Sequence, residues 1–138
     1  MDWRECIKKK IVKDIKVDFD LIESLIKTSS NNLKSEEKLE FDDSTFGSKI
    51  SLAYDSLREL LEALAIKKGY KIYNHECYVY FLKEILNESI KGDEFDELRK
   101  VRNSINYYGK DILLNDAKIV IIRIKKLRNE IKIILDRD

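Results

Sequence analysis

Proline is absent from this 138-residue sequence, which also has only four glycines, two cysteines and one histidine. An all-β sandwich or barrel needs turn residues roughly every 8–12 positions and is normally rich in both proline and glycine. One histidine is too few for an HExxH zinc motif, no Ser/His/Asp set is apparent, and no glycine-rich phosphate loop occurs. These absences favour an all-α fold and exclude the commonest metal and nucleotide motifs, so we expect no metal and no cofactor.

Long apolar runs are also missing. No uninterrupted run approaches the roughly 18–20 residues that a membrane span requires, and the start, MDWRECIKKK, lacks the apolar core of a signal peptide. We therefore expect a cytosolic protein with no membrane attachment. Disulfides are rare in the cytosol, and Cys6 and Cys77 form no CxxC pair. Buried reduced thiols are expected, rather than a disulfide, a metal site or a nucleophile.

From the length and composition we expect a single helical domain spanning residues 1–138. Hydrophobic residues make up 43% of the chain and charged residues 38%, which is too apolar for disorder and suits helices with one solvated face. With 27 Lys+Arg and 26 Asp+Glu, the formal charge is +1, so any polyanion has to be bound by a local patch. Lys, Ile and Glu are abundant and Gln is absent, as in many thermophile proteins, although a biased genome would produce the same composition.

The spacing of apolar residues predicts an up-and-down bundle of five or six helices. The predicted helices lie near residues 3–15, 20–38, 46–68, 75–91, 93–109 and 115–135. The acidic stretch EEKLEFDDST, residues 36–45, predicts a loop or a frayed helix end. Asp18 and Asn74 are positioned to cap helices, Gly69 to end one in the left-handed conformation, and Gly92 to break the chain between two helices.

The stretch RKVRNSINYYGK, residues 99–110, has the strongest functional pattern. On a helix, Leu98, Val101, Ile105 and Tyr108 fall on one side, and Arg99, Arg102, Asn103 and Asn106 on another. Arg102 lies nearest the apolar edge, where a half-buried guanidinium is suited to bind phosphate or carboxylate. The alternative is that Arg99 and Arg102 only form surface ion pairs with acids such as Glu94 or Glu97.

Charge is segregated along the chain even though its total is near zero. Residues 97–132 contain ten Lys or Arg and four Asp or Glu, a local excess of 10 − 4 = +6. This excess makes an anionic partner plausible for the C-terminal half. Such a run is also typical of a merely solvated helix face.

The stretch LRKVRNSINYYGK, with the preceding segments SLAYDSLRELLEALAIKKGYK and NHECYVYFLKEIL, resembles the HEPN (higher eukaryotes and prokaryotes nucleotide-binding) superfamily. The resemblance runs over roughly residues 44 to 112. It implies a helical bundle that forms a homodimer, with two copies of the Arg99–Tyr108 helix facing each other across a cleft. Many members of the family are ribonucleases of toxin–antitoxin or defence systems, often paired with a minimal nucleotidyltransferase.

The family signature is an arginine, a polar residue directly after it, and a histidine further along the same helix. Arg102 and Asn103 match the first two positions, but Tyr107, with Asn106 beside it, stands where the histidine is expected. A tyrosine with a pKa of about 10 is only about 0.1% ionised at pH 7 and is a poor general base. The resemblance therefore implies weak or absent ribonuclease activity. His75 lies outside the signature and could serve only if folding or dimerisation brought it toward Arg102.

The resemblance also assigns candidate residues. Arg102, Asn103 and Tyr107 are the catalytic candidates, and Arg99, Arg102, Asn106 and Lys110 are the candidates for binding RNA or a nucleotide. In some family members the nucleotidyltransferase modifies a tyrosine near the signature, which makes Tyr107 and Tyr108 candidates here. A different class of function stays open, namely a non-catalytic helical adaptor or dimerisation protein that docks an acidic protein partner.

Overall fold

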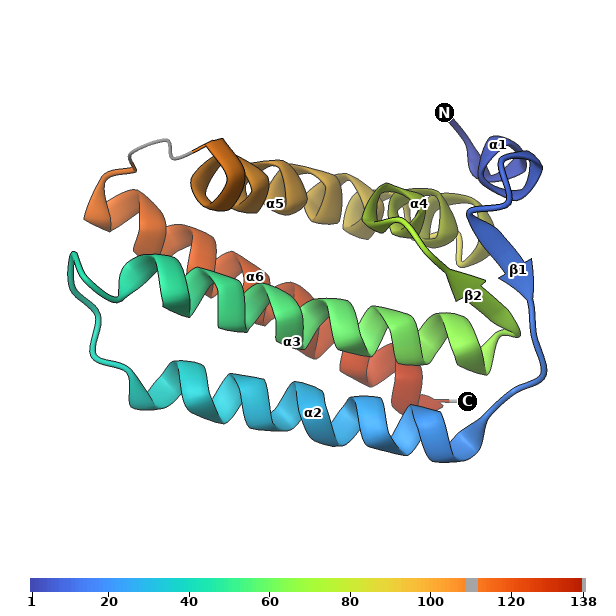
Figure 1. Cartoon of the computed structure of the whole chain (residues 1–138), viewed down its shortest axis with the longest axis horizontal. Coiled ribbons are helices and arrows are strands. Elements are labelled where there is room, and N and C mark those ends of the chain that lie inside the picture. The colour runs from blue at the N-terminus through green and yellow to red at the C-terminus, as the bar shows by residue number, and fades with distance from the viewer. Residues whose placement is uncertain (109–111, 138) are drawn as a thin grey trace.

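The computed structural model describes the backbone of residues 1–108 and 112–137, and the side chains of residues 1–105 and 112–137. Within these ranges the chain forms six α-helices packed together and one two-stranded antiparallel sheet, and it is 76% helical (Figure 1). The predicted all-α bundle of five or six helices is confirmed.

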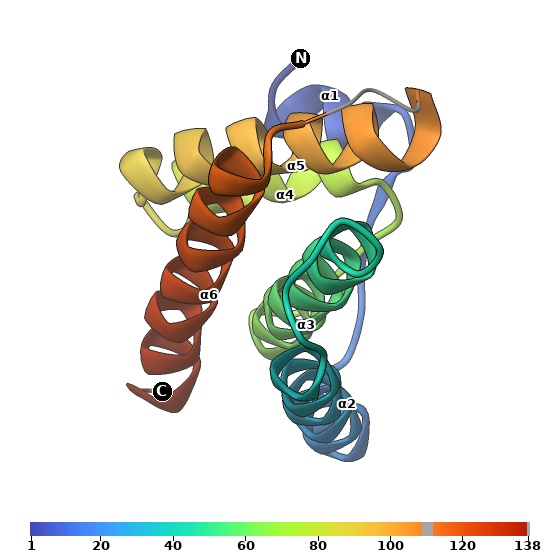
Figure 2. The same ribbon diagram turned by 90° about the vertical axis from the view of Figure 1, so that its left-hand side faces the viewer.

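Three of the four long helices pack together. They are α2 (Phe19–Lys38), α3 (Phe46–Lys67) and α6 (Leu114–Arg137). The central helix, α3, packs against both of the others and is the most buried of the three (Figure 2). The caps are as predicted at two points: Asp18 accepts from the backbone N–H of Leu21, and Gly69 has φ of 91° just after α3.

Buried polar groups join these three helices. Ser29 of α2 and Ser56 of α3 are completely buried and exchange hydrogen bonds through their hydroxyls and carbonyls. Arg128 of α6 reaches the same point and donates from Nε to Ser56 Oγ over 2.8 Å. Small serine side chains allow the helices to approach closely, and the arginine satisfies their oxygens. Burial lowers the pKa of Arg128.

The acidic segment 36–45 is only partly the connection that its composition predicts. Helix α2 continues to Lys38, and Glu36 is 1% exposed. Its carboxylate forms ion pairs with Lys49 of α3 at 3.4 Å and Lys125 of α6 at 2.6 Å. Glu36 is therefore an interior charge held by two lysines, and the connection covers residues 39–45.

The prediction of one helix over residues 3–15 is wrong. Helix α1 covers only Trp3–Lys8, Lys10 has a positive φ of 60°, and strand β1 follows at Val12–Asp14. Strand β1 pairs antiparallel with β2 (Tyr70–Ile72). The four-residue spacing of isoleucines here reflects two separate elements, since Ile7 is 48% exposed and Val12 is buried. Pairing with a distant strand has overridden the local helical pattern.

The prediction of a break at Gly92 is also wrong. Helix α4 (His75–Tyr80), capped by Asn74 as predicted, continues as a π-helical turn at Phe81–Ile85, and α5 (Ser89–Tyr108) begins before Gly92. The chain turns at Asn87, whose φ is 54°. Residue 92 lies inside α5, and it is a glycine because this position has no room for a side chain. An added Cβ would lie 2.4 Å from Lys83 Cγ and 3.1 Å from the carbonyl oxygen of Val79.

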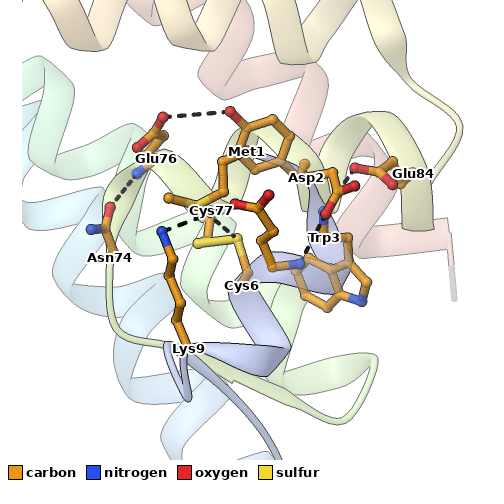
Figure 3. Close-up of a disulfide and its surroundings, with 11 residues drawn as sticks. Met1, Asp2, Trp3, Cys6, Lys9, Asn74, Glu76, Cys77 and Glu84 are labelled. Carbon is orange, nitrogen blue, oxygen red and sulfur yellow. Dashed lines mark hydrogen bonds and ion pairs between the residues drawn. A yellow bond between two sulfur atoms is a disulfide. The ribbon is translucent and has the colours of Figure 1, made fainter.

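Cys6 and Cys77 form a disulfide, so the prediction of reduced thiols is wrong. The bond joins α1 to α4, where the two Cα atoms are 6.2 Å apart and both cysteines are completely buried (Figure 3). Beside it, the backbone N–H of Trp3 donates to Glu84 Oε2 over 2.9 Å, and the indole packs against Tyr70 and Phe81. A separation of 71 residues hides this pairing from any local reading of the sequence.

Candidate functional site

Helix α5 presents the core side that its sequence predicts. Phe95 and Leu98 are completely buried, and Val101 and Ile105 are half-buried against the core. Arg99, Arg102 and Asn103 are half-buried. The side chains of Asn106, Tyr107 and Tyr108, and residue Lys110 as a whole, lie outside the described part of the chain. The catalytic, binding and modification roles predicted for these four residues therefore stay predictions.

Arg102 packs its guanidinium onto an aromatic ring of α3. The side chain is 13% exposed, and its Cζ lies 4.8 Å from the centre of the Tyr54 ring. A nitrogen of the guanidinium lies 4.0 Å from Asp55 Oδ1, and another donates to Asn103 Oδ1 over 3.4 Å. Stacking on a tyrosine fixes the plane of a guanidinium and leaves its edge available for hydrogen bonds.

The structure brings the only histidine of the chain to this ring. A hydrogen bond of 3.1 Å joins the Tyr54 hydroxyl to His75 Nδ1, and the two rings are 5.8 Å apart. Tyr54 is completely buried and stacks on Phe95 of α5. Arg102, Tyr54 and His75 thus form a connected row that draws on α5, α3 and α4. No spacing in the sequence indicated this, because the three residues belong to different helices.

The charges of two further arginines, Arg58 and Arg99, affect the pKa values of Tyr54 and His75. Arg58, one turn after Tyr54 in α3, is ion-paired with Glu62 at 3.3 Å. Arg99, one turn before Arg102 in α5, donates to Asp96 Oδ1 over 2.8 Å, and its Nε is buried without a hydrogen-bond partner among the described residues. We call Arg58, Arg99, Arg102, Tyr54 and His75 the arginine–histidine cluster.

Burial, followed by the charges of Arg58, Arg102 and Arg99, lowers the pKa of His75 to about 4. The imidazole is therefore neutral at pH 7. Burial raises the pKa of Tyr54, although the same three arginines lower it. The Tyr54 hydroxyl therefore stays protonated. The cluster is thus a set of three permanent cations around two neutral groups that can both donate and accept hydrogen bonds.

The ion pairs expected for the motif are present with different partners. Arg99 pairs with Asp96, whereas Glu94 and Glu97 both pair with Arg123 of α6. The local excess of positive charge is reduced in the same way, by acids that come largely from outside residues 97–132. Ion pairs of this kind are Lys100–Asp96, Arg123–Glu94, Lys125–Glu36 and Lys132–Asp136.

A cavity among the described residues lies away from this cluster. A cavity of about 700 Å³ lies between the first turns of α5 and the middle of α6, and Ile90, Arg123, Lys126 and Glu130 are among the residues that line it. Arg102 does not line this cavity. The arginine–histidine cluster is a half-buried polar site, with Asp55 (37% exposed) and Asp96 (30% exposed) at its edge.

The described residues contain no group of three or more His, Cys, Asp or Glu side chains that could hold a metal ion. Over the same part of the chain, no helix is long and apolar enough to cross a membrane. No protein-family model matches the chain, and neither does any curated protein sequence.

Proposed function

We propose that the protein binds RNA or a nucleotide through the phosphate groups of its ligand, and that the arginine–histidine cluster is the binding site. The observation that carries the proposal is the stack of Arg102 on Tyr54, which in turn is hydrogen-bonded to His75. A guanidinium held in one plane by an aromatic ring, with two more arginines whose charges act on the same tyrosine and histidine, suits a phosphate that accepts paired N–H donors. Neither the sequence motif nor the fold alone would single out this point.

We expect ribonuclease activity at this site to be weak or absent. Metal-independent cleavage needs a base for the 2′-hydroxyl and positive charge on the phosphorane. The three arginines provide positive charge. His75 is deprotonated at pH 7, but a group whose pKa is about 4 is a weak base at neutral pH. An active enzyme would have to use as the base either His75, whose pKa is low, or Tyr107, a tyrosine with an ordinary pKa of about 10.

The resemblance to HEPN proteins supplies the biological setting of the proposal. In that setting the protein belongs to a toxin–antitoxin or defence module, forms a homodimer through the Arg99–Tyr108 helix, and pairs with a minimal nucleotidyltransferase that modifies Tyr107 or Tyr108. Asn106 and Lys110 would extend the phosphate contacts beyond Arg99 and Arg102.

We also place the protein in the cytosol, although it carries a disulfide. Cytosolic disulfides are rare in mesophiles and common in hyperthermophiles. The absence of Gln and the abundance of Lys, Ile and Glu are typical of thermophile proteins as well, so the two observations agree.

A second candidate function is supported by the outer face of α6. Ile119, Ile122 and Ile133 are each more than half exposed on this helix, and Ile90, at the nearby cavity, is 85% exposed. Exposed isoleucines next to lysines such as Lys118 and Lys126 would suit a non-catalytic adaptor that docks an acidic protein partner. This candidate predicts no binding of nucleic acid.

The two functions are separated by RNA-binding anisotropy with a fluorescein-labelled single-stranded RNA of mixed sequence, with and without EDTA. Under the proposal, Arg102→Ala weakens binding by roughly 10–100-fold, as expected for lost hydrogen bonds to a charged group. The matched control is Arg137→Ala, which removes the same charge from an exposed residue at the end of α6. Equal weakening by both variants, or no binding by the unmodified protein, contradicts the proposal.

A further inference from the structure

His75 is the one group of the cluster whose ordinary pKa lies near neutral pH. Charged and titratable side chains from three helices act on its ring or contact it. They are Tyr54, Arg58 and Glu62 of α3, Arg99 and Arg102 of α5, and Tyr78 of its own helix. Glu62 is in turn ion-paired with Lys71 of β2, whose Nζ lies 2.6 Å from Glu62 Oε1. Among the charges that act on His75, the three arginines oppose its protonation and Glu62 favours it.

We propose that a phosphate group binding among Arg58, Arg99 and Arg102 causes His75 to take up one proton from solvent, with Tyr54 as the group that links the two events. The inference rests on the proposed function, because it assigns the ligand to the same site. It adds that binding is coupled to a proton and that Tyr54 and His75, which lie outside the motif, are part of the site.

The first reason is electrostatic. The three guanidinium groups carry fixed positive charge, and each lies near an acid. Glu62 is 3.3 Å from Arg58, Asp96 is 2.8 Å from Arg99, and Asp55 is 4.0 Å from Arg102. A bound phosphate adds negative charge at the groups that disfavour the imidazolium ion. Since the site is half-buried, solvent screens this added charge only in part.

The second reason is the hydrogen bond between Tyr54 and His75. A tyrosine hydroxyl both donates and accepts, so it can accept from His75 Nδ1–H once the ring is protonated. The Tyr54 O–H proton is then free to be donated toward an anion near Arg102, whose guanidinium lies over the same ring. Both protonation states of His75 therefore have a hydrogen-bond partner at Nδ1. A buried phenylalanine at position 54 would offer neither state a partner.

The coupling has a definite sign. The bound protein holds a proton that the free protein lacks, so a lower pH favours binding. Between the pKa of His75 in the free protein, about 4, and its higher value in the complex, the dissociation constant falls up to about tenfold for each pH unit of acidification. Above the pKa of the complex, affinity no longer depends on this group.

The chain contains a single histidine, so the Cε1–H signal of His75 is unambiguous in a ¹³C–¹H NMR spectrum. The probe is a hexameric oligouridine, whose phosphodiesters and bases do not titrate between about pH 4 and 8. The His75 signal is titrated over that range in the free protein and with saturating RNA, for the unmodified chain and for Tyr54→Phe. RNA affinity at each pH is measured in parallel for the unmodified chain and for His75→Gln.

The expected result is a pKa of His75 that rises by at least one pH unit when RNA binds. In Tyr54→Phe, RNA still binds but the rise is largely lost, and His75→Gln removes the tightening of binding at low pH. If RNA binds in an Arg102-dependent manner while the His75 titration is unchanged, the proton coupling is wrong and the proposed function stands. If RNA does not bind at any pH, both are wrong.

Discussion

The Cys6–Cys77 disulfide is the feature whose removal has the most calculable effect. The bond closes a loop with a sequence separation of 71 residues. In the chain-entropy model, a loop of this length restricts the unfolded state by an amount worth about 4 kcal/mol at 25 °C. We therefore expect Cys6→Ala/Cys77→Ala to lower the free energy of unfolding by up to about 4 kcal/mol, a large part of the roughly 5–15 kcal/mol typical of a domain.

The assay is urea unfolding followed by far-ultraviolet circular dichroism, together with the fluorescence of Trp3. Trp3 is the only tryptophan, is 7% exposed, and lies in α1 with Cys6, so it reports on the tethered segment. Cys6→Ala alone and Cys77→Ala alone should each lose about as much stability as the double variant, because either change removes the same bond. Excess dithiothreitol should lower the urea midpoint of the unmodified protein to a value similar to that of the double variant.

Two results would refute this reasoning. One is a native protein whose mass under non-reducing conditions shows two free thiols. The other is an oxidised protein whose unfolding midpoint is unchanged both by dithiothreitol and by the double substitution.

Three further predictions concern other parts of the fold. Gly92→Ala should destabilise the protein despite the better helix propensity of alanine, because the new Cβ meets Lys83. Gly47→Ala should stabilise it by about 0.5 kcal/mol in the same urea assay, because a Cβ added there has no atom within 4 Å. Glu36→Gln should lower the free energy of unfolding by about 3 kcal/mol, because it leaves two lysines without their buried partner. The same substitution at the exposed neighbouring residue, Glu37→Gln, should cost almost nothing, and similar losses for the two variants would contradict the buried ion pairs. The pKa of His75 is lower in the folded protein than in the unfolded chain, so its contribution to stability is complete above about pH 6.5 and is lost as the pH falls toward 4. The loss is about 1–2 kcal/mol after allowance for solvent screening, and it should disappear in His75→Gln. Parallel curves of unfolding free energy against pH for the two proteins would show that the pKa of the histidine is not perturbed.

Much of the fold was predictable because its signals are local. Asp18, Asn74 and Gly69 act at helix ends through their own backbone and side-chain chemistry, so each could be identified from neighbouring residues. The long periodic helices α3 and α6 followed from their apolar spacing for the same reason.

The errors all arise where distant segments meet. Strand β1 forms because Val12 pairs with Ile72, and Gly92 is required by the approach of another segment of the chain rather than by a turn. The disulfide depends on α1 folding back onto α4, which no spacing reveals. In each case a tertiary contact decided between local conformations of similar energy.

The candidate site was only half predictable for the same reason. The motif identified Arg99, Arg102 and Asn103, because a helix places them on one side of α5. It did not identify Tyr54, Arg58 or His75, since these residues reach the site from α3 and α4. The resemblance to HEPN proteins directed attention to the histidine missing from α5, whereas the structure places the only histidine of the chain next to the ring on which Arg102 stacks.

The most direct test of the account is to observe the arginine side chains while ligand is added. In ¹⁵N–¹H spectra of the unmodified protein, with the Nε–H signals assigned by single Arg→Lys variants, oligouridine RNA should shift the signals of Arg58, Arg99 and Arg102. The signal of Arg123, which is held by Glu94 and Glu97, should stay in place. Binding that leaves the three cluster signals unmoved, or that shifts Arg123 instead, would contradict the claim that the arginine–histidine cluster is the phosphate site.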